Sequence, residues 1–361
     1  MDSSKTEKKI RPNIQAMPGY VPGEQPQGGV FVKLNTNESP TPPSEKILDA
    51  CAEVIHRGLH RYPDPMANRF RQVASDVLGV PPEWIMAGNG SDDILTILTR
   101  TFVGEGEILR LPYPSYILYK SLAQLQGACS EEILFGEDWS LTPQFAEATP
   151  GLKLVYLPNP NSPSGTVVSR EEIVRLAEAL PCPLVVDEAY ADFADFNCVD
   201  LVLEHRNLIV TRTLSKAYAL AGLRFGFVVA HPELIEQFTK VKDSYNCDAL
   251  AIAVATAALE DREWFARHIA ETRAMRASME ERFRALGFTV TPSQTNFIWC
   301  THKTLPLKPI YEYLKKQNIF VRYMPYPQWP TDRGEGLRIS VGTEEEIATL
   351  IRNVESIMRS V

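Results

Sequence analysis

Short apolar runs alternate with helical stretches through the middle of the chain. Apolar residues recur at helical spacing from Ser44 to Arg57 and, more weakly, from Arg69 to Leu78, which predicts two helices. Runs rich in Val, Ile and Leu then predict strands over residues 107–111, 153–157, 183–187, 207–211 and 224–230. Ser169 stands three residues before Glu172, a capping-box spacing that predicts a helix start between two of these strands. This alternation is typical of a parallel or mixed sheet covered by helices.

The carboxyl-terminal part of the chain predicts a second, smaller unit. From about Asp248 to Leu286 the sequence is almost continuously helical, and this length suits a helix that connects two domains. Strands are then predicted over residues 289–290, 296–300, 319–322 and 337–341, with helices over 307–317 and from Thr343 onward. Residues 10–45 are rich in Pro, Gly and Asn, which predicts an irregular arm. We therefore expect an arm over 1–45 that packs with the small domain, a large α/β domain over 46–255 and a small α+β domain over 256–361.

Composition and charge narrow the class of protein. With 361 residues, 44% of them hydrophobic, the chain can fill two cores. Its formal net charge of -8 and pI near 5.4 argue against a nucleic-acid or anionic-membrane partner, because neither is attracted to an acidic surface. The six cysteines lie far apart with no C-x-x-C pair, which argues against disulfides and a zinc site. Reduced thiols suit a cytosolic protein, and we expect no metal site.

Targeting and membrane signals are weak. The amino terminus is polar and lacks the apolar stretch that a signal peptide needs. The longest apolar run, Ala249 to Leu259, is too short to cross a bilayer and is interpreted as a buried helix. The sequence therefore predicts a cytoplasmic protein with no membrane partner.

One segment carries a candidate nucleophile. Lys216 lies among small and apolar residues, and Arg224 follows eight positions later. A lysine in a partly apolar pocket near a second cation has a lowered pKa, which frees the lone pair needed to form a Schiff base with an aldehyde. Arg224 could hold an anion attached to that aldehyde, and pyridoxal phosphate is such a molecule. Taken alone, the segment could equally be a surface Lys and Arg around a buried strand.

Other distinctive residues lie where predicted strands end, which is where ligands gather in an α/β sheet. Asp187 ends an apolar strand and needs a cationic partner, which a protonated pyridine nitrogen or a nearby arginine could provide. After the strand at 153, a loop with three prolines could hold Asn161 at a fixed point. Gly90 and Ser91 open a helix whose free N–H groups favour a phosphate. Tyr116 could stack on a flat ring or pack in the core.

Eight motifs follow the order found in one family, and the chain resembles the fold-type-I pyridoxal-phosphate aminotransferases from about Leu34 to its carboxyl terminus. The motifs are Leu34-Asn35-Thr36-Asn37-Glu38, Arg61-Tyr62-Pro63-Asp64, Gly90-Ser91-Asp92, Pro114-Ser115-Tyr116, Asn161-Ser162-Pro163-Ser164-Gly165, Asp187-Glu188-Ala189-Tyr190, Ser215-Lys216 with Ala221-Gly222-Leu223-Arg224, and Gly336-Leu337-Arg338-Ile339-Ser340-Val341-Gly342. The resemblance implies a mostly parallel seven-stranded sheet between helices, a smaller α+β domain and pyridoxal 5'-phosphate as cofactor. Within the family, the motifs are most similar to the branch that moves an amino group between glutamate and imidazole-acetol phosphate in histidine biosynthesis.

The resemblance also implies a role for each matching residue toward the cofactor. Lys216 would bind it covalently and then carry a proton between substrate and cofactor. Asp187 would pair with the ring nitrogen, and Tyr190 would pair with the ring hydroxyl. The phosphate and the ring would be held by Gly90, Ser91, Asp92, Tyr116, Thr213, Ser215 and Arg224.

A substrate site and a shared dimer site follow from the same resemblance. Arg338 would bind the α-carboxylate of small-molecule amino-acid and 2-oxo-acid substrates through a bidentate pair. Asn37 would also contact the substrate, while Tyr20 and Arg322 would help to bind its distal phosphate. Tyr62 would reach the cofactor phosphate of the neighbouring subunit, so a homodimer is implied.

One motif departs from the family pattern. Two asparagines commonly precede the proline in this loop, and the second contacts the ring hydroxyl, whereas here that position is Ser162. Either Ser162 makes a weaker contact or Asn161 takes over the role.

Two other reactions stay open on sequence alone. A similar scaffold and similar motifs support a lyase, such as a threonine-phosphate decarboxylase, and an aromatic amino-acid aminotransferase. The bond that breaks depends on which substituent at the substrate Cα lies perpendicular to the ring, and the sequence does not reveal that geometry. A nicotinamide dehydrogenase and a P-loop enzyme are excluded, because no G-x-G-x-x-G follows a strand and no G-x-x-x-x-G-K-[ST] occurs. An inert binding protein is disfavoured by the joint presence of Lys216, Asp187 and Arg224.

Overall fold

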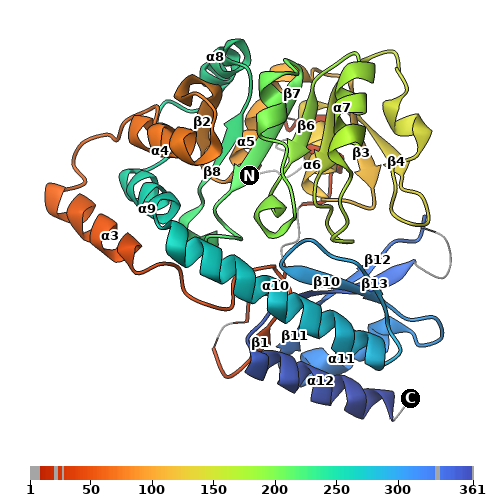
Figure 1. The fold of residues 1–361 in the computed structure, drawn as a ribbon. Coiled ribbons are helices and arrows are strands. Elements are labelled where there is room, and N and C mark those ends of the chain that lie inside the picture. Colours follow the sequence, from red (N-terminus) through yellow and green to blue (C-terminus); the bar gives the residue numbers. More distant parts are fainter. Residues whose placement is uncertain (1–8, 20–22, 27, 330–333, 360–361) are drawn as a thin grey trace.

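A computed structural model describes residues 9–19, 23–26, 28–329 and 334–359, and Figure 1 shows two units joined by one long helix. One unit is built on a seven-stranded sheet, and the other on a four-stranded sheet. The long helix, α10 (Arg262–Ala285), runs along the seam between them. In the described part of the chain, no helix is long and apolar enough to cross a membrane.

Six of the seven strands of the large sheet are mostly buried, whereas β4 (Cys129–Leu134) at one edge has no buried residue. The seven strands are β2 (Ile85–Gly88), β3 (Ile108–Tyr113), β4, β5 (Leu152–Pro158), β6 (Leu184–Asp187), β7 (Leu208–Thr213) and β8 (Gly226–Val229). Their order across the sheet is β2-β8-β7-β6-β5-β3-β4. The five strands from β7 to β4 run parallel, whereas β8 is antiparallel to both of its neighbours. The mostly parallel seven-stranded sheet is therefore confirmed.

Helices cover both faces of this sheet. They are α4 (Asn68–Leu78), α5 (Ser91–Phe102), α6 (Leu118–Gln126), α7 (Arg170–Ala179), α8 (Pro232–Val241) and α9 (Ala249–Glu260), while α3 (Lys46–Arg57) packs on α9 rather than on the sheet. In β5, Val155 and Leu157 share a core with α4, α7 and α9, whereas Leu154 and Tyr156 share one with α5, α6 and α8. Successive strand residues point to opposite faces, so one buried strand can fill both cores. Short 3-10 helices lie at Pro82–Trp84, Pro143–Ala146, Ala191–Phe193, Asp200–Leu203 and Ala221–Leu223.

The small domain packs three helices on an antiparallel sheet. Its strands are β9 (Thr289–Thr291), β10 (Phe297–Thr301), β12 (Arg322–Pro325) and β13 (Glu335–Ser340), in the order β12-β13-β10-β9. α10, α11 (Leu307–Lys316) and α12 (Glu344–Met358) bury their apolar residues against it. Thr343 opens α12 with a complete capping box, as its sequence predicts.

The amino-terminal arm touches both domains. β1 (Val32–Lys33) pairs in parallel with β11 (Ile319–Phe320) of the small domain. Further toward the amino terminus, α2 (Pro12–Ala16) lies on α6, where the Asn13 amide donates to the Gln124 carbonyl at 2.7 Å. The domain boundaries given above stay a prediction.

The strands predicted from long apolar runs all form, but shorter or more polar elements were missed. β2 has the sequence Ile-Met-Ala-Gly with a single β-branched residue, and β4 is an edge strand that contains Ser and two Glu, so neither gives a run rich in Val, Ile and Leu. The helical stretch from Asp248 to Leu286 is not continuous, because Asp261 ends α9 and caps α10 by accepting from the Trp264 N–H at 3.3 Å. Capping requires a non-helical backbone at Asp261, and this breaks the predicted helix in two.

Candidate active site

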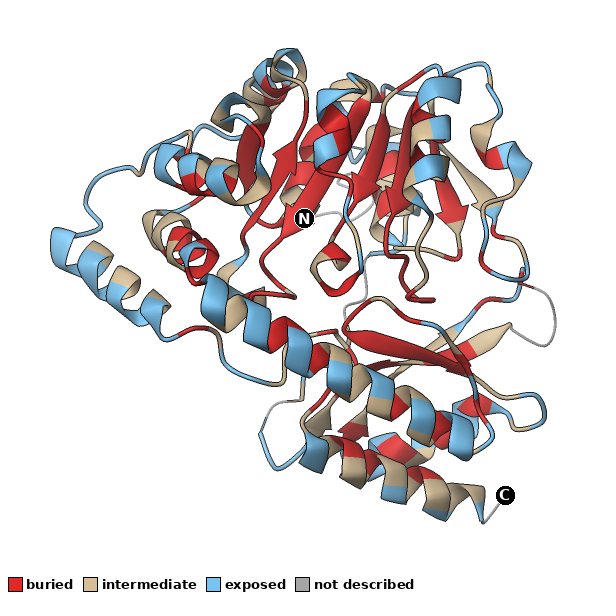
Figure 2. Ribbon diagram, viewed as in Figure 1, coloured by how far each residue is buried: buried red, intermediate tan, exposed pale blue. Residues whose placement is uncertain are grey.

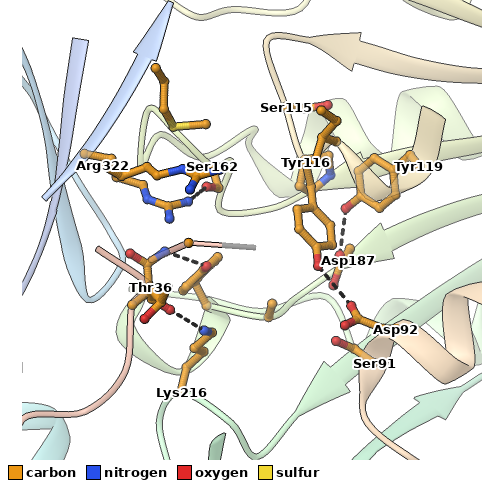
Figure 3. A pocket seen from close by; sticks show the side chains of 18 of the residues that line it. Thr36, Ser91, Asp92, Ser115, Tyr116, Tyr119, Ser162, Asp187, Lys216 and Arg322 are labelled. Atoms are coloured by element: carbon orange, nitrogen blue, oxygen red, sulfur yellow. Dashed lines mark hydrogen bonds between the residues drawn. The ribbon is translucent and has the colours of Figure 1, made fainter. Parts of the chain in front are cut away.

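A cavity of about 540 Å³ lies between the domains, at the carboxyl ends of the parallel strands. Pro158, Asp187 and Thr213 line it, and they are the last residues of β5, β6 and β7. Most of the predicted site residues also line it: Asn37, Ser91, Asp92, Tyr116, Tyr190, Ser215, Lys216, Arg224, Arg322 and Arg338. Residues from the arm and from both domains therefore meet in one place (Figure 3).

Lys216 enters the cavity from the loop after β7. Its Nζ donates to the backbone carbonyl of Thr36 at 3.1 Å, as Figure 3 shows. Burial, and secondly the positive charges of Arg338 and Arg224, lower the pKa of Lys216 to about 8 although nearby carboxylates oppose the shift. A fraction of this amine is therefore unprotonated near neutral pH, as a nucleophile toward an aldehyde must be.

Asp187 forms the buried floor of the cavity. Its side chain accepts hydrogen bonds from the Tyr119 hydroxyl at 2.7 Å and the Thr211 hydroxyl at 3.0 Å. Burial raises the pKa of Asp187 to about 6, while both hydroxyls act to lower it. The carboxyl group is therefore mostly ionised at neutral pH. No residue in the described part of the chain forms an ion pair with it, which leaves the charge for a cationic ligand group.

The next residue, Glu188, is also a buried carboxylate, but it has a cationic partner within the protein. Glu188 is fully buried, and its carboxylate meets the Arg212 guanidinium at 2.9 Å. Arg212 also pairs with Asp192. The two adjacent acidic residues thus have different partners. Glu188 is paired with an arginine, whereas Asp187 accepts from hydroxyl groups and also faces the cavity.

A phosphate-sized anion fits at the start of α5. Gly90 precedes this helix without any side-chain cap, so the N–H groups of the first turn are free for an anion. A Cβ on Gly90 would lie 2.8 Å from the Arg224 guanidinium, and a Cβ on Gly226 would lie 2.6 Å from the Ser91 nitrogen. The Arg224 guanidinium therefore lies beside the start of α5. Thr213 and Ser215, whose hydroxyls lie 3.0 Å apart, extend this polar wall.

Tyr116 and Asp92 are linked at the same end of the cavity. The Tyr116 hydroxyl donates to Asp92 at 3.1 Å, and the Arg224 guanidinium lies 3.4 Å from the other carboxylate oxygen. A carboxylate repels a phosphate, so Asp92 can serve such an anion only through its backbone N–H. Its side chain instead orients Tyr116, whose ring lines the cavity.

Two arginines of the small domain form the facing wall. Arg322 on β12 lies directly opposite Arg338 on β13, so both side chains leave the same face of the sheet. Arg338 donates to the Ser162 hydroxyl at 2.8 Å and to the Asn35 carbonyl at 3.1 Å. This pair of cations can bind an anionic substrate that reaches across from Lys216.

Asn37 ties the arm to both domains. Its amide donates to the Tyr190 hydroxyl at 2.8 Å, and its side-chain oxygen accepts from Ser340 at 3.1 Å. The backbone of Asn37 is left-handed, with φ of 55°, which asparagine tolerates better than most residues. The hydroxyl of Tyr190 is thereby held at the cavity wall.

Asn161 lies beside the cavity rather than in its lining. Its amide nitrogen donates to the Ser164 hydroxyl at 2.9 Å, and its oxygen is buried without a hydrogen-bond partner in the described part of the chain. Ser162 lines the cavity in its place. Of the two alternatives for this loop, the geometry favours a contact by Ser162.

Tyr62 is not brought to this cavity. Tyr62 is 79% exposed, and its ring stacks on Tyr245 with centroids 4.3 Å apart. It does not line the cavity of its own chain, and its predicted role in a neighbouring subunit stays a prediction. Tyr20 lies outside the described residues.

Three residues at the site were missed in the sequence. Tyr119 and Thr211 bind Asp187, and the backbone of Thr36 binds Lys216. A signal for two of them existed. Tyr119 follows Tyr116 by three residues, and Thr211 is the first polar residue after the apolar run that opens a fully buried strand.

Comparisons with known proteins agree with this geometry. Residues 30–354 match the family model for aminotransferase class I and II. A histidinol-phosphate aminotransferase of Rhodopirellula baltica is 55% identical over 98% of this chain and 96% of its own length. A histidinol-phosphate aminotransferase 1 of Trichormus variabilis is 42% identical over 97% of this chain and 99% of its own. Among solved structures, the histidinol-phosphate aminotransferase of Sinorhizobium meliloti in complex with pyridoxal-5'-phosphate has a TM-score of 0.88 at 26% identity and covers 98% of each chain.

The lowered pKa of Lys216 can be measured directly. We expect the reductive methylation of Lys216 in the cofactor-free protein, followed by peptide mass spectrometry, to reach half its maximal rate near pH 8 rather than at the ordinary lysine value of 10.5. Arg338→Met should move this midpoint upward, because the arginine charge lowers the pKa. A wild-type midpoint at the ordinary lysine value would contradict the described environment.

Proposed function

Because the chain belongs to the class I and II aminotransferases, we propose that it transfers an amino group between histidinol phosphate and 2-oxoglutarate, the reaction of histidine biosynthesis. It uses pyridoxal phosphate and works by a ping-pong mechanism. The observation that carries the proposal is the facing arrangement of Lys216 and Asp187 on one wall and Arg322 and Arg338 on the other. The identity to curated histidinol-phosphate aminotransferases supports the choice of substrate.

The residues present fit pyridoxal phosphate. When bound, it supplies an aldehyde for the amino group and a protonated ring that withdraws electrons from the substrate Cα. Lys216 is the amine that holds it, and Asp187 is the buried anion that matches its ring nitrogen. The free start of α5 and the Arg224 guanidinium match its phosphate.

We assign the remaining cofactor contacts from their places in the cavity. Tyr116 offers its ring face, and Tyr190 offers a hydroxyl that Asn37 orients. Ser162 is the loop residue that faces the ligand, in preference to Asn161. The Lys216 amine would be the group that moves the proton to and from the substrate Cα.

The arginine pair explains how one site accepts two different substrates. A ping-pong enzyme binds both substrates at the same place in turn. Histidinol phosphate carries a phosphate, and glutamate carries two carboxylates, so each brings anionic groups to Arg322 and Arg338. We assign the distal phosphate to Arg322 and the α-carboxylate of glutamate to Arg338.

We further propose a homodimer with shared sites. α3 has no buried residue, and Figure 2 shows it exposed along its length at the edge of the large domain. Leu48, Ile55 and Leu59 on and after this helix are each at least 60% exposed, and Tyr62 follows them. An apolar surface of this kind is typical of a subunit interface, and a partner bound there would cover it.

A product assay separates the candidate reactions. We expect the protein, histidinol phosphate and 2-oxoglutarate to yield glutamate. Arg322→Met should raise KM for histidinol phosphate about 10- to 100-fold, because a charge-assisted contact is lost. Lys120→Met is the matched control, since Lys120 also lines the cavity but is paired with Glu132 at 2.6 Å, and it should have little effect.

Two results of this assay would reject the proposal. Release of carbon dioxide from phosphothreonine without amino transfer would identify a lyase. Equally efficient use of phenylalanine or tyrosine would identify an aromatic amino-acid aminotransferase.

The dimer has its own test. Ile55→Glu should yield monomers in sedimentation velocity and weaken pyridoxal phosphate binding, because Tyr62 no longer reaches the neighbouring site. Leu203→Glu is the control, as Leu203 is an exposed apolar residue, 46% accessible, on another surface. A wild-type monomer that binds the cofactor fully would contradict the shared site.

A further inference from the structure

Tyr119 contacts Asp187 at the end of the cavity that lies away from Arg322 (Figure 3). It belongs to α6, and its side chain is fully buried. Its hydroxyl donates to the Asp187 carboxylate at 2.7 Å, the shorter of the two hydroxyl contacts to that group (Figure 3). Burial and the Asp187 charge raise the pKa of Tyr119 well above its ordinary value, so this hydroxyl keeps its proton and remains a donor.

The ring of Tyr119 is fixed by other aromatic residues. It stacks on Tyr156 with centroids 4.7 Å apart and an interplanar angle of 19°, and it meets Tyr116 edge-on at 5.5 Å. The Tyr156 hydroxyl points away from Asp187 to other partners, the Thr99 hydroxyl and the Leu95 carbonyl, each at 2.8 Å. A donor held this firmly has little freedom to follow a moving carboxylate.

The contacts to Asp187 leave it limited room for a ligand. An ionised carboxylate offers about four lone-pair sites. Tyr119, Thr211 and the Ala189 backbone N–H occupy three of them. About one site is left on a residue that lines the cavity, and it can accept one N–H from a ligand.

We propose that Tyr119 is a positioning residue that keeps the Asp187 carboxylate ionised and aims its remaining lone pair at the ring nitrogen of the cofactor. The inference rests on the proposed function, since it assigns a role within the same site. A carboxylate that already accepts a strong hydrogen bond is a weaker base, so the shared proton stays on the ring nitrogen. Without the Tyr119 hydroxyl, Asp187 is more basic and can rotate, and the proton shifts toward the carboxylate.

Tyr119→Phe and Tyr156→Phe form a matched pair of variants. Each removes one hydroxyl from a fully buried tyrosine and keeps the stacked ring, but only Tyr119 bonds to Asp187. A role in packing alone predicts similar behaviour of the two variants. A role in positioning Asp187 predicts that they differ.

The test uses holoenzyme prepared with pyridoxal phosphate carrying 15N in its ring. In wild type and Tyr156→Phe, the 15N resonance should be that of a protonated ring nitrogen across pH 6 to 8. In Tyr119→Phe it should move toward the unprotonated position, and the cofactor dissociation constant should rise about tenfold. The first half-reaction with histidinol phosphate should also slow about tenfold in Tyr119→Phe.

Several outcomes would overturn the inference. One is a 15N resonance of the cofactor ring in Tyr119→Phe that is the same as in wild type. Another is a resonance in Tyr156→Phe that shifts as much as in Tyr119→Phe. If Tyr119→Phe does not fold, Thr211→Val is measured instead. Tyr119 still donates to Asp187 in that variant, so the ring nitrogen should stay protonated. A deprotonated ring nitrogen in Thr211→Val would overturn the assignment to Tyr119. The resonance does not depend on the substrate, so a wild type inactive toward histidinol phosphate would reject the proposed function and leave this inference standing.

Discussion

The buried charge of Asp187 is the constraint on which the site depends. An ionised carboxylate at the end of an apolar strand is costly unless hydrogen bonds and a cation offset the lost hydration. Glu188 meets this need with Arg212, whereas Asp187 has only hydroxyl and backbone donors among the described residues. A protonated pyridine ring supplies the positive charge that Asp187 needs. The pKa of about 6 for Asp187 and of about 8 for Lys216 together place an anion and a partly neutral amine in one cavity near neutral pH.

The architecture explains why these groups meet. Parallel strands bring Pro158, Asp187 and Thr213 to one edge of the sheet, and α5 points its free amino-terminal end at the same edge. The small domain closes the other side with Arg322 and Arg338, which lie opposite each other on β12 and β13. In the assignment that we propose, the large domain holds the cofactor, and Arg322 and Arg338 on the facing wall select the substrate.

Much of this arrangement could be predicted from the sequence, and the exceptions have physical reasons. The apolar runs predicted five of the seven strands of the large sheet, and the motifs predicted that Lys216, Asp187 and Arg224 belong to one site, where they line one cavity. β2 and β4 were missed because β2 has only one β-branched residue and β4 is a polar edge strand, so neither carries the pattern of a buried strand. Tyr119 was missed because its role depends on a hydrogen bond between residues 68 positions apart. The roles of Asn161 and Ser162 depend on which side chain of a stiff loop faces inward, and spacing alone does not determine that.

The most direct measurement compares Asp187→Asn with wild type in a single turnover with histidinol phosphate and in equilibrium binding of pyridoxal phosphate. The substitution keeps the size of the side chain and removes its charge. If that charge keeps the ring protonated, the single-turnover rate falls more than about 100-fold while the dissociation constant of the cofactor rises less than about tenfold. Equal losses in rate and in binding would contradict the account, because Asp187 would then serve only to hold the cofactor in place.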